Sequence, residues 1–285
     1  MKKTTNSVKK NMVADGIFAQ QVGRIEVFML VESQALGDAG ILLNADHEIL
    51  ARCIPKEGFT KTTNAFLIKT PEKNIMIDTG IGAGDTILDR LRTLGLEPDM
   101  IDAVLLTHLH RDHFGGLRLG GLQGDGGAVF PNASIFVPAR DFEYFTQINL
   151  NQAAADILAL YEGRLDTFEP GGLGGAIVPL FSGISPVANF GHTPGHTVFL
   201  IEDEIEDEGE RLFIAGDFLH IALVQFPNPD ISATYDVNPA AAAASRRQIL
   251  GYAATNNIPI GGMHIIQPGV GRVEAEGNGF RFVPM

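Results

Sequence analysis

One short segment, residues 107–113, places three histidines and an aspartate within six positions and directly follows an apolar run. Imidazole nitrogens and carboxylate oxygens are the ligands that borderline cations such as Zn²⁺ accept. On an extended turn, His108 and His110 face one side because they are two residues apart. Asp112 and His113 are adjacent and point apart, which suits a second, neighbouring ion. A polar surface loop with chance histidines explains the cluster poorly, since the chain has only eight histidines in 285 residues.

Three later segments carry the same types of ligand, and each follows a predicted strand. Residues 191–196 read Gly-His-Thr-Pro-Gly-His, residues 215–217 read Ala-Gly-Asp, and residues 262–264 read Gly-Met-His. Functional residues tend to collect in loops at the ends of strands, where a rigid sheet positions them. The four segments together therefore predict one polar site that distant parts of the chain assemble.

Composition narrows the classes of partner that this chain can have. Its net charge of −13 argues against nucleic acid, which calls for basic patches, and against anionic membranes. No apolar run approaches the length of a membrane span. The single cysteine, Cys53, leaves no internal disulfide and no cysteine-based zinc site, which fits a reducing compartment. We expect a cytoplasmic protein without a signal peptide and with a small-molecule substrate as its partner.

The spacing of apolar residues predicts two blocks of strands, each followed by helices, and hence two sheets packed together with helices outside. Residues 1–20 are predicted to form a flexible tail and residues 21–285 a single domain. Residues 32–62 show no clear period and are predicted to be loops and short strands that line a site or bury against a second copy in a homodimer. The predicted strands are 24–31, 64–70, 74–78, 103–107, 134–137, 184–190, 197–201, 211–215 and a hairpin over 270–283, and the predicted helices are 85–94, 139–147, 152–161 and 238–255.

The order His-x-His-x-Asp-His, Gly-His-Thr-Pro-Gly-His, Gly-Asp and a late histidine resembles the metallo-β-lactamase-fold hydrolase superfamily. The resemblance spans residues 64–264. It implies the α/β (α+β) class and a four-layer αββα sandwich with the metals at one edge, in agreement with the two blocks of strands. Carried over by position, it implies that one metal is held by His108, His110 and His192, that the other is held by Asp112, His113 and His264, and that Asp217 bridges both.

The resemblance implies a metal-dependent hydrolase with two divalent ions, typically Zn²⁺, although the same ligands accept Fe, Mn or Co. A bridging hydroxide would attack the electrophilic carbon or phosphorus of a small ester, lactone or phosphotriester. Asp112 or Asp217 could then move the proton to the leaving group. A glyoxalase II-like thioester hydrolase and an iron-dependent redox enzyme on the same fold stay open as alternatives. So does a protein without catalytic activity whose metal is structural.

Within this superfamily, residues 216–220 together with residues 224–227 and 235–237 resemble methyl parathion hydrolase-like members. Quorum-quenching lactonases share the metal-ligand set, but they carry a tyrosine three residues after the bridging aspartate, where this chain has His220. His220 either donates a hydrogen bond to a substrate or leaving-group oxygen, or is packed beneath the site. The best-known β-lactamases carry a cysteine where this chain has Asp217, so we do not expect β-lactam hydrolysis.

Five residues near these motifs have roles that the sequence leaves open. Asp78 ends a strand and is either a hydrogen-bond acceptor that fixes a histidine tautomer or an aspartate that caps a turn. His196 is expected to make a structural hydrogen bond. Phe114, Phe218 and Phe226 either line an apolar pocket or belong to the core.

Overall fold

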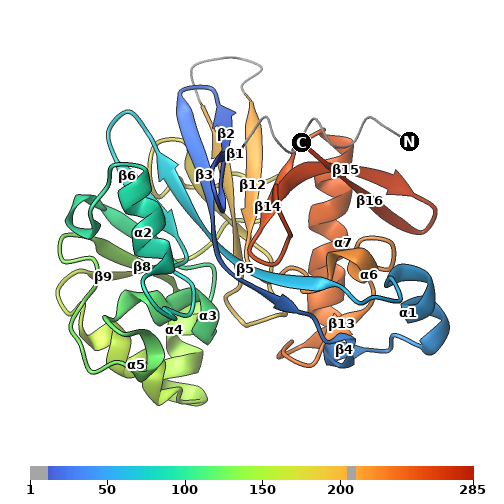
Figure 1. The fold of residues 1–285 in the computed structure, drawn as a ribbon, viewed down its shortest axis with the longest axis horizontal. Coiled ribbons are helices and arrows are strands. Elements are labelled where there is room, and N and C mark those ends of the chain that lie inside the picture. The colour runs from blue at the N-terminus through green and yellow to red at the C-terminus, as the bar shows by residue number, and fades with distance from the viewer. Residues whose placement is uncertain (1–11, 204–209) are drawn as a thin grey trace.

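Two β-sheets form the centre of the protein in the computed structural model, which describes residues 12–203 and 210–285. Within these residues one sheet has eight strands and the other has six (Figure 1). The first sheet contains, in spatial order, β1 (Met12–Ala14), β2 (Ile17–Val22), β3 (Ile25–Leu36), β5 (Thr60–Lys69), β6 (Asn74–Ile77), β7 (Ala103–Leu105), β8 (Ser134–Pro138) and β9 (Leu165–Phe168). The second contains β10 (Ile184–Ala188), β11 (Thr197–Glu202), β12 (Arg211–Ala215), β14 (Ile260–Gly262), β15 (Val270–Glu276) and β16 (Gly279–Pro284).

Alternating side chains give each sheet two apolar faces, because successive residues of a strand point to opposite sides. In β3, Val27 packs between the two sheets, whereas Phe28 packs under the helices that cover the first sheet. In β12, Ile214 packs between the sheets and Phe213 packs toward the opposite helical layer. Both sheets are therefore buried on both faces, which confirms the predicted αββα sandwich.

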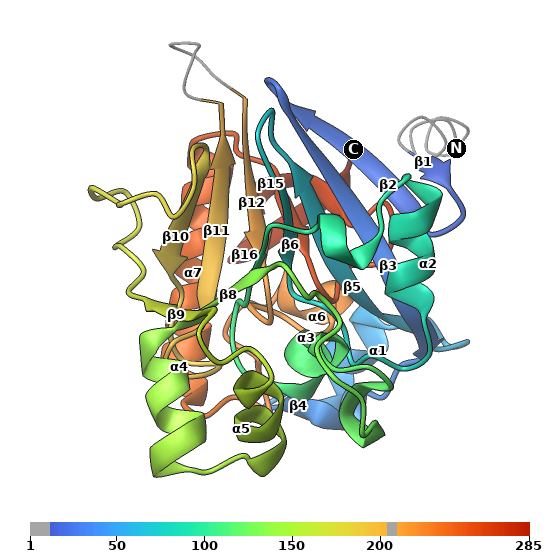
Figure 2. The same cartoon turned by 90° about the vertical axis from the view of Figure 1, so that its left-hand side faces the viewer.

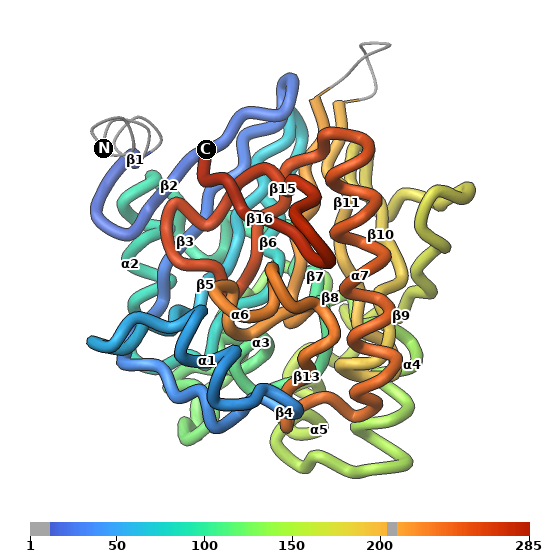
Figure 3. Tube along the Cα trace, turned by 90° about the vertical axis from the view of Figure 1, so that its right-hand side faces the viewer, coloured from blue at the N-terminus to red at the C-terminus, as the bar shows by residue number. Residues whose placement is uncertain are grey.

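Helices cover the outer face of each sheet. The outer face of the first sheet is covered by α2 (Thr86–Thr93), α4 (Ala139–Glu143) and α5 (Gln152–Ala159) (Figure 2). The long helix α7 (Pro239–Thr255) covers the second sheet (Figure 3). The remaining short elements are α1 (His47–Cys53), α3 (Arg111–Phe114), α6 (Ala222–Gln225), the strand pair β4 (Leu42–Leu43) and β13 (Ser232–Ala233), and 3-10 turns at Ala39–Ile41, Pro98–Met100, Gly115–Leu117 and Gly121–Gln123. Among the described residues, no helix combines the length and apolar character that crossing a bilayer requires.

Helix α7 begins where the sequence predicts, and its start shows why. The side chain of Asn238 accepts a hydrogen bond from the backbone N–H of Ala241 at 3.1 Å, and Pro239 occupies the first turn. Proline suits that position because the first-turn N–H has no partner within the helix. Ile249 and Leu250 then bury its inner face against the second sheet.

The predicted tail over residues 1–20 is wrong for its second half, and residues 1–11 lie outside the described part of the chain. Strands β1 and β2 begin at Met12 and Ile17, and β2 pairs with β3 in antiparallel register. Ile17 and Val22 are each 1% exposed. Burial of these apolar side chains stabilises the strand, and the polar residues around them hide the pattern in the sequence.

Residues 32–62 also contain more structure than their sequence indicates. β3 continues to Leu36 past a bulge between Val31 and Ser33, and helix α1 begins after Asp46, whose side chain caps it. The apolar face of α1 packs against residues that lie far along the chain, such as Ile221. A helix this short depends on such tertiary contacts, so its own seven residues give little signal. The predicted helix 139–147 is likewise split into α4 and a π-helical turn, Tyr144–Ile148.

Strand direction brings the predicted site residues to one edge of the sandwich. In the first sheet β6 and β7 run parallel, and in the second sheet β12 and β14 run parallel. β10 points the same way as β12, since both pair antiparallel with β11. The loops that follow these five strands carry Asp78, residues 108–113, His192, Asp217 and His264.

Candidate metal centre

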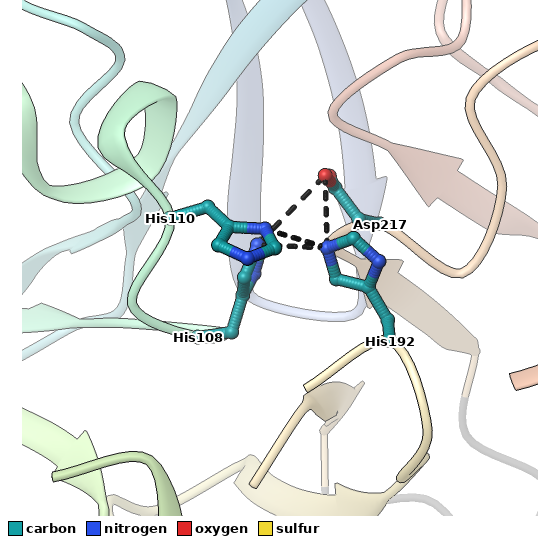
Figure 4. A group of neighbouring side chains, drawn as sticks. All are labelled: His108, His110, His192 and Asp217. Atoms are coloured by element: carbon teal, nitrogen blue, oxygen red, sulfur yellow. Dashed lines mark hydrogen bonds and ion pairs between the residues drawn. The ribbon is translucent and has the colours of Figure 1, made fainter. Parts of the chain in front are cut away.

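Three histidines and one aspartate from three loops converge on one point (Figure 4). His192 Nε2 lies 2.8 Å from His110 Nδ1 and 3.2 Å from His108 Nε2. Asp217 Oδ2 lies 3.3 Å from His192 Nε2 and 3.8 Å from His108 Nε2. The four ligand atoms lie within 4.8 Å of one another, close enough to surround a single cation.

A second group forms on the other side of Asp217. It consists of Asp112, His113 and His264, whose ligand atoms also lie within 4.8 Å of one another. Asp217 Oδ1 lies 3.0 Å from His113 Nε2 and 3.0 Å from His264 Nε2. The two oxygens of Asp217 therefore face different groups. All seven residues that the sequence predicts as metal ligands lie together in this arrangement.

Asp78 orients the histidines that follow β7. Its Oδ2 accepts a hydrogen bond from His113 Nδ1 at 2.6 Å and another from Thr107 Oγ1 at 2.7 Å. Thr107 Oγ1 in turn lies 3.0 Å from Nδ1 of His108. In both rings Nδ1 carries the proton that makes this hydrogen bond. The Nε2 atoms of His108 and His113 therefore present lone pairs to the site. Of the two roles that the sequence leaves open for Asp78, the structure shows the hydrogen bond to a histidine.

The histidines of the second sheet are oriented in the same way. His192 Nδ1 lies 2.8 Å from Asp236 Oδ1, and His264 Nδ1 donates to the carbonyl oxygen of Thr62 at 2.8 Å. A carbonyl oxygen can only accept, so Nδ1 of His264 carries a proton and Nε2 is the ring nitrogen that faces the site. Residues 235–237 belong to a segment with a family resemblance, but the contact of Asp236 with His192 was not predicted. No local signal marks this contact, because Asp236 lies 44 positions from His192.

The donor atoms fit divalent cations. His113 Nε2 and Asp217 Oδ1 are buried without a hydrogen-bond partner, an arrangement that a bound ion would satisfy. Burial, and then the neighbouring His192, lower the pKa of His110 to about 3, so its ring is neutral and can bind a metal. Burial opposes a charge on His264, but Asp217 and Asp112 outweigh it and raise its pKa to about 9. The carboxylates thus attract positive charge to this point.

Asp141, at the start of α4, ties the two histidine loops together and was not found from the sequence. Its Oδ2 accepts hydrogen bonds from Leu109 N at 3.0 Å and Thr193 Oγ1 at 2.8 Å, and its Oδ1 accepts one from Gly195 N at 2.6 Å. Burial raises the pKa of Asp141 to about 6. Through this one side chain, the loop that carries His108 and His110 is fixed against the loop that carries His192.

The two remaining histidines near the site have different environments. His196 Nδ1 lies 3.0 Å from the carbonyl oxygen of Asn189, which is the structural hydrogen bond expected of it. His220 Nε2 lies 3.2 Å from Asp217 Oδ2, and its side chain lines the cleft above the two groups. His220 is therefore both packed beside Asp217 and within reach of a molecule in the cleft.

A cleft of about 680 Å³ opens over both groups, which is large enough for a small molecule. The hypothesis that Phe114, Phe218 and Phe226 line this space is wrong. They are at most 2% exposed and belong to the apolar cores under the sheets. The cleft is lined by Ser33, Ala35, Asp38, Ile41, Phe59, Lys61, Thr62, Thr63, Ile81, His110, Arg111, Asp112, Asn151, Asp217, His220, Ile221, Tyr235 and His264.

Comparison with known proteins agrees with this geometry. The family model described as the metallo-beta-lactamase superfamily matches residues 59–253, so the chain belongs to that superfamily. The structure is similar to that of a hydrolase named AbOPH in the beta-lactamase superfamily, with 27% identity, a TM-score of 0.78, and coverage of 96% of this chain and 98% of the other. It is also similar to AidC, a dizinc quorum-quenching lactonase, with 25% identity, a TM-score of 0.81, and coverage of 95% and 97%. The lactonase-like resemblance seen in the motifs is thereby confirmed.

Curated relatives match over shorter segments. A transcription termination factor, FttA of Methanosarcina mazei, is 29% identical over 144 residues, which are 46% of this chain and 21% of that protein. The chain therefore spans about a fifth of this relative's length. A match of this extent supports the shared fold and carries no statement about the activity of the whole relative.

Proposed function

We propose that this chain is a dinuclear metal-dependent hydrolase that cleaves a small ester, lactone or phosphotriester. The observation that carries the proposal is the position of Asp217, whose two oxygens face two separate groups of buried ligand atoms. The likeness to a dizinc quorum-quenching lactonase over nearly the whole of both chains supports it further.

The proposed ligands follow from the two groups of side chains. When bound, two divalent cations at such a site activate a shared water as a nucleophile and polarise the substrate oxygen. Zinc suits the imidazole and carboxylate donors best, and Fe, Mn and Co are accepted by the same atoms. One ion would be held by His108, His110 and His192, the other by Asp112, His113 and His264, and Asp217 would bind both.

The other functional groups of the cleft would position the substrate and move protons. Burial lowers the pKa of His220, so its imidazole is neutral and can donate a hydrogen bond to a substrate or leaving-group oxygen. Asp112 is a third exposed in the cleft, with a side-chain exposure of 33%. Burial opposes its ionisation, but His113 outweighs this and lowers the pKa of Asp112. Its carboxylate can therefore accept a proton and return it to the leaving group.

A hydrolysis panel on zinc-loaded protein tests the proposal. The panel contains a γ-lactone, an aryl ester, a phosphotriester and a thioester, and each is also given to the Asp217→Asn variant. We expect turnover of an oxygen ester, lactone or phosphotriester. The variant should lose about 100-fold or more of this activity, because the amide cannot supply negative charge to both ions.

Two other outcomes would contradict the proposal. Turnover of the thioester alone would favour the glyoxalase II-like alternative. Full activity in Asp217→Asn would mean that the two groups take no part in hydrolysis. Metal analysis of the purified protein distinguishes the redox alternative from the proposed hydrolase, because the redox alternative predicts a single iron per chain.

A further inference from the structure

Two cationic side chains line the cleft over the candidate metal centre. Lys61 lies at the start of β5 and Arg111 lies at the start of α3, and both line the cleft over the candidate metal centre. Neither side chain makes an ion pair or hydrogen bond with any residue that the structure describes. Elsewhere, Arg92 pairs with Asp89 at 2.8 Å, whereas Lys56 and Arg272 pair with no residue that the structure describes, so the distinguishing feature of Lys61 and Arg111 is their position in the cleft.

Lys61 and Arg111 are positively charged, whereas the whole chain has a net charge of −13. Three carboxylates line the same cleft, namely Asp38, Asp112 and Asp217. Asp38 accepts a hydrogen bond from Gly40 N at 2.8 Å, and the other two are proposed metal ligands whose charge two dications would outweigh. With two dications bound, these charges together with Lys61 and Arg111 would outweigh the three carboxylates and make the lining of the cleft positive on an otherwise acidic protein. A cleft of one sign of charge concentrates ligands of the opposite sign.

Both cations lie close in sequence to groups of the metal centre. Arg111 stands between two proposed ligands, His110 and Asp112. Lys61 directly precedes Thr62, whose carbonyl oxygen accepts the hydrogen bond from His264. Both side chains also line the same cleft as His264 and Asp217, so a substrate group that contacts them would lie in the cleft over the candidate metal centre. The same cleft is also lined by apolar side chains, among them Ala35, Ile41, Phe59 and Ile221, and by polar ones such as Ser33 and Thr63.

We infer that the substrate carries a carboxylate near the scissile ester or lactone bond, and that Lys61 and Arg111 bind this carboxylate. The inference rests on the proposed hydrolase function and specifies its substrate class. An ammonium and a guanidinium both donate charge-assisted hydrogen bonds to a carboxylate, and arginine can do so with two parallel bonds.

A matched pair of esters tests this inference on the zinc-loaded protein. 4-Nitrophenyl hemisuccinate and 4-nitrophenyl butyrate share a leaving group and an acyl chain of similar size, but only the first carries a carboxylate. We expect kcat/KM to be at least about tenfold higher for the hemisuccinate, and this preference to fall as salt is added. Lys61→Met and Arg111→Met should each remove most of the preference through a higher KM for the hemisuccinate.

Control variants separate the charge from its position. Lys61→Arg should keep the preference, because it keeps the cation. Lys56→Met removes an exposed lysine of the same segment that does not line the cleft, and it should change nothing. The zinc content of Arg111→Met is measured alongside, since this residue lies between two proposed ligands. A wild-type protein without preference, or one whose preference survives both methionine variants, overturns the inference.

A binding measurement decides the inference even if the proposed hydrolysis fails. Calorimetry compares glutarate with butyrate on the zinc-loaded protein, because the two differ by one carboxylate. We expect glutarate to bind about tenfold more tightly, and this advantage to be lost in Lys61→Met. If neither ester is hydrolysed, the calorimetry still decides the carboxylate subsite, and the lactone and phosphotriester of the hydrolysis panel decide the proposed function. Equal affinity for glutarate and butyrate would contradict the carboxylate subsite alone.

Discussion

At the scale of single residues, the candidate centre depends on acceptors behind the histidines rather than on the histidines alone. Asp78 is fully buried and has a φ of 57°, a backbone conformation that costs a residue other than glycine about 1 kcal/mol or more. Its bonds to Thr107 and His113 hold it there. The protein thus keeps a strained backbone at the residue whose hydrogen bonds orient His113 directly and His108 through Thr107.

We predict that Asp78→Asn weakens metal binding by about 10- to 100-fold while the fold is kept. The asparagine amide offers a donor to His113 Nδ1 in place of a carboxylate, so the ring no longer presents the Nε2 lone pair reliably. Competition with a zinc chelator measures the affinity. Asp166→Asn, on the exposed side of β9, serves as the matched control and should bind zinc as the unchanged protein does. Equal affinity in both variants would show that Asp78 only caps a turn.

At the scale of elements, the parts of the site whose residues are close together in the sequence could be predicted. Contacts between distant segments could not. The histidine loops were visible because their residues are close in sequence and follow apolar strands. The role of Asp141 could not be seen in the sequence, because its partner Thr193 lies 52 positions away. Helix α1 was missed for the same reason, since its apolar side chains are covered by residues near Ile221. Tertiary contacts between distant segments produce no periodic pattern of apolar residues in the sequence of either segment.

The pKa of Asp141 gives a prediction at this scale, since its carboxyl links two loops through α4. Its pKa is about 6 in the folded chain and 3.8 as an ordinary value. Between these values the folded protein binds the proton more tightly than the unfolded chain does. The free energy of unfolding therefore falls as pH rises from about 4 to about 6, by up to about 1.4 kcal/mol for each pH unit.

Asp141→Asn lacks this dependence because an amide does not titrate. Urea unfolding of the metal-free protein at several pH values from about 4.5 to 6.5 measures it. The difference in unfolding free energy, unchanged protein minus variant, should shrink as pH rises. Parallel curves for the two proteins would mean that burial does not raise the pKa of Asp141.

At the scale of the whole molecule, the candidate centre joins the two sheets. His108, His110, Asp112 and His113 follow a strand of the first sheet, whereas His192, Asp217 and His264 follow strands of the second. Ions held between them would bind the folded chain and not the unfolded one. Such binding stabilises the fold by about 4 kcal/mol at a free metal concentration of 1,000 Kd.

We therefore predict that chelation lowers the Tm by roughly 10 °C. Scanning calorimetry in zinc and in excess chelator measures the shift. The Asp217→Asn variant should show a much smaller difference between the two conditions, because it lacks the carboxylate that both groups share. An equal Tm in zinc and in excess chelator would contradict a metal site that joins the two sheets.

Two ions on either side of Asp217 are the central prediction for this protein, and anomalous X-ray diffraction from crystals of the zinc-loaded protein tests it most directly. We predict two zinc peaks, one among His108, His110 and His192 and the other among Asp112, His113 and His264, with one oxygen of Asp217 toward each. A single peak, or a second zinc bound away from Asp217, would contradict the account.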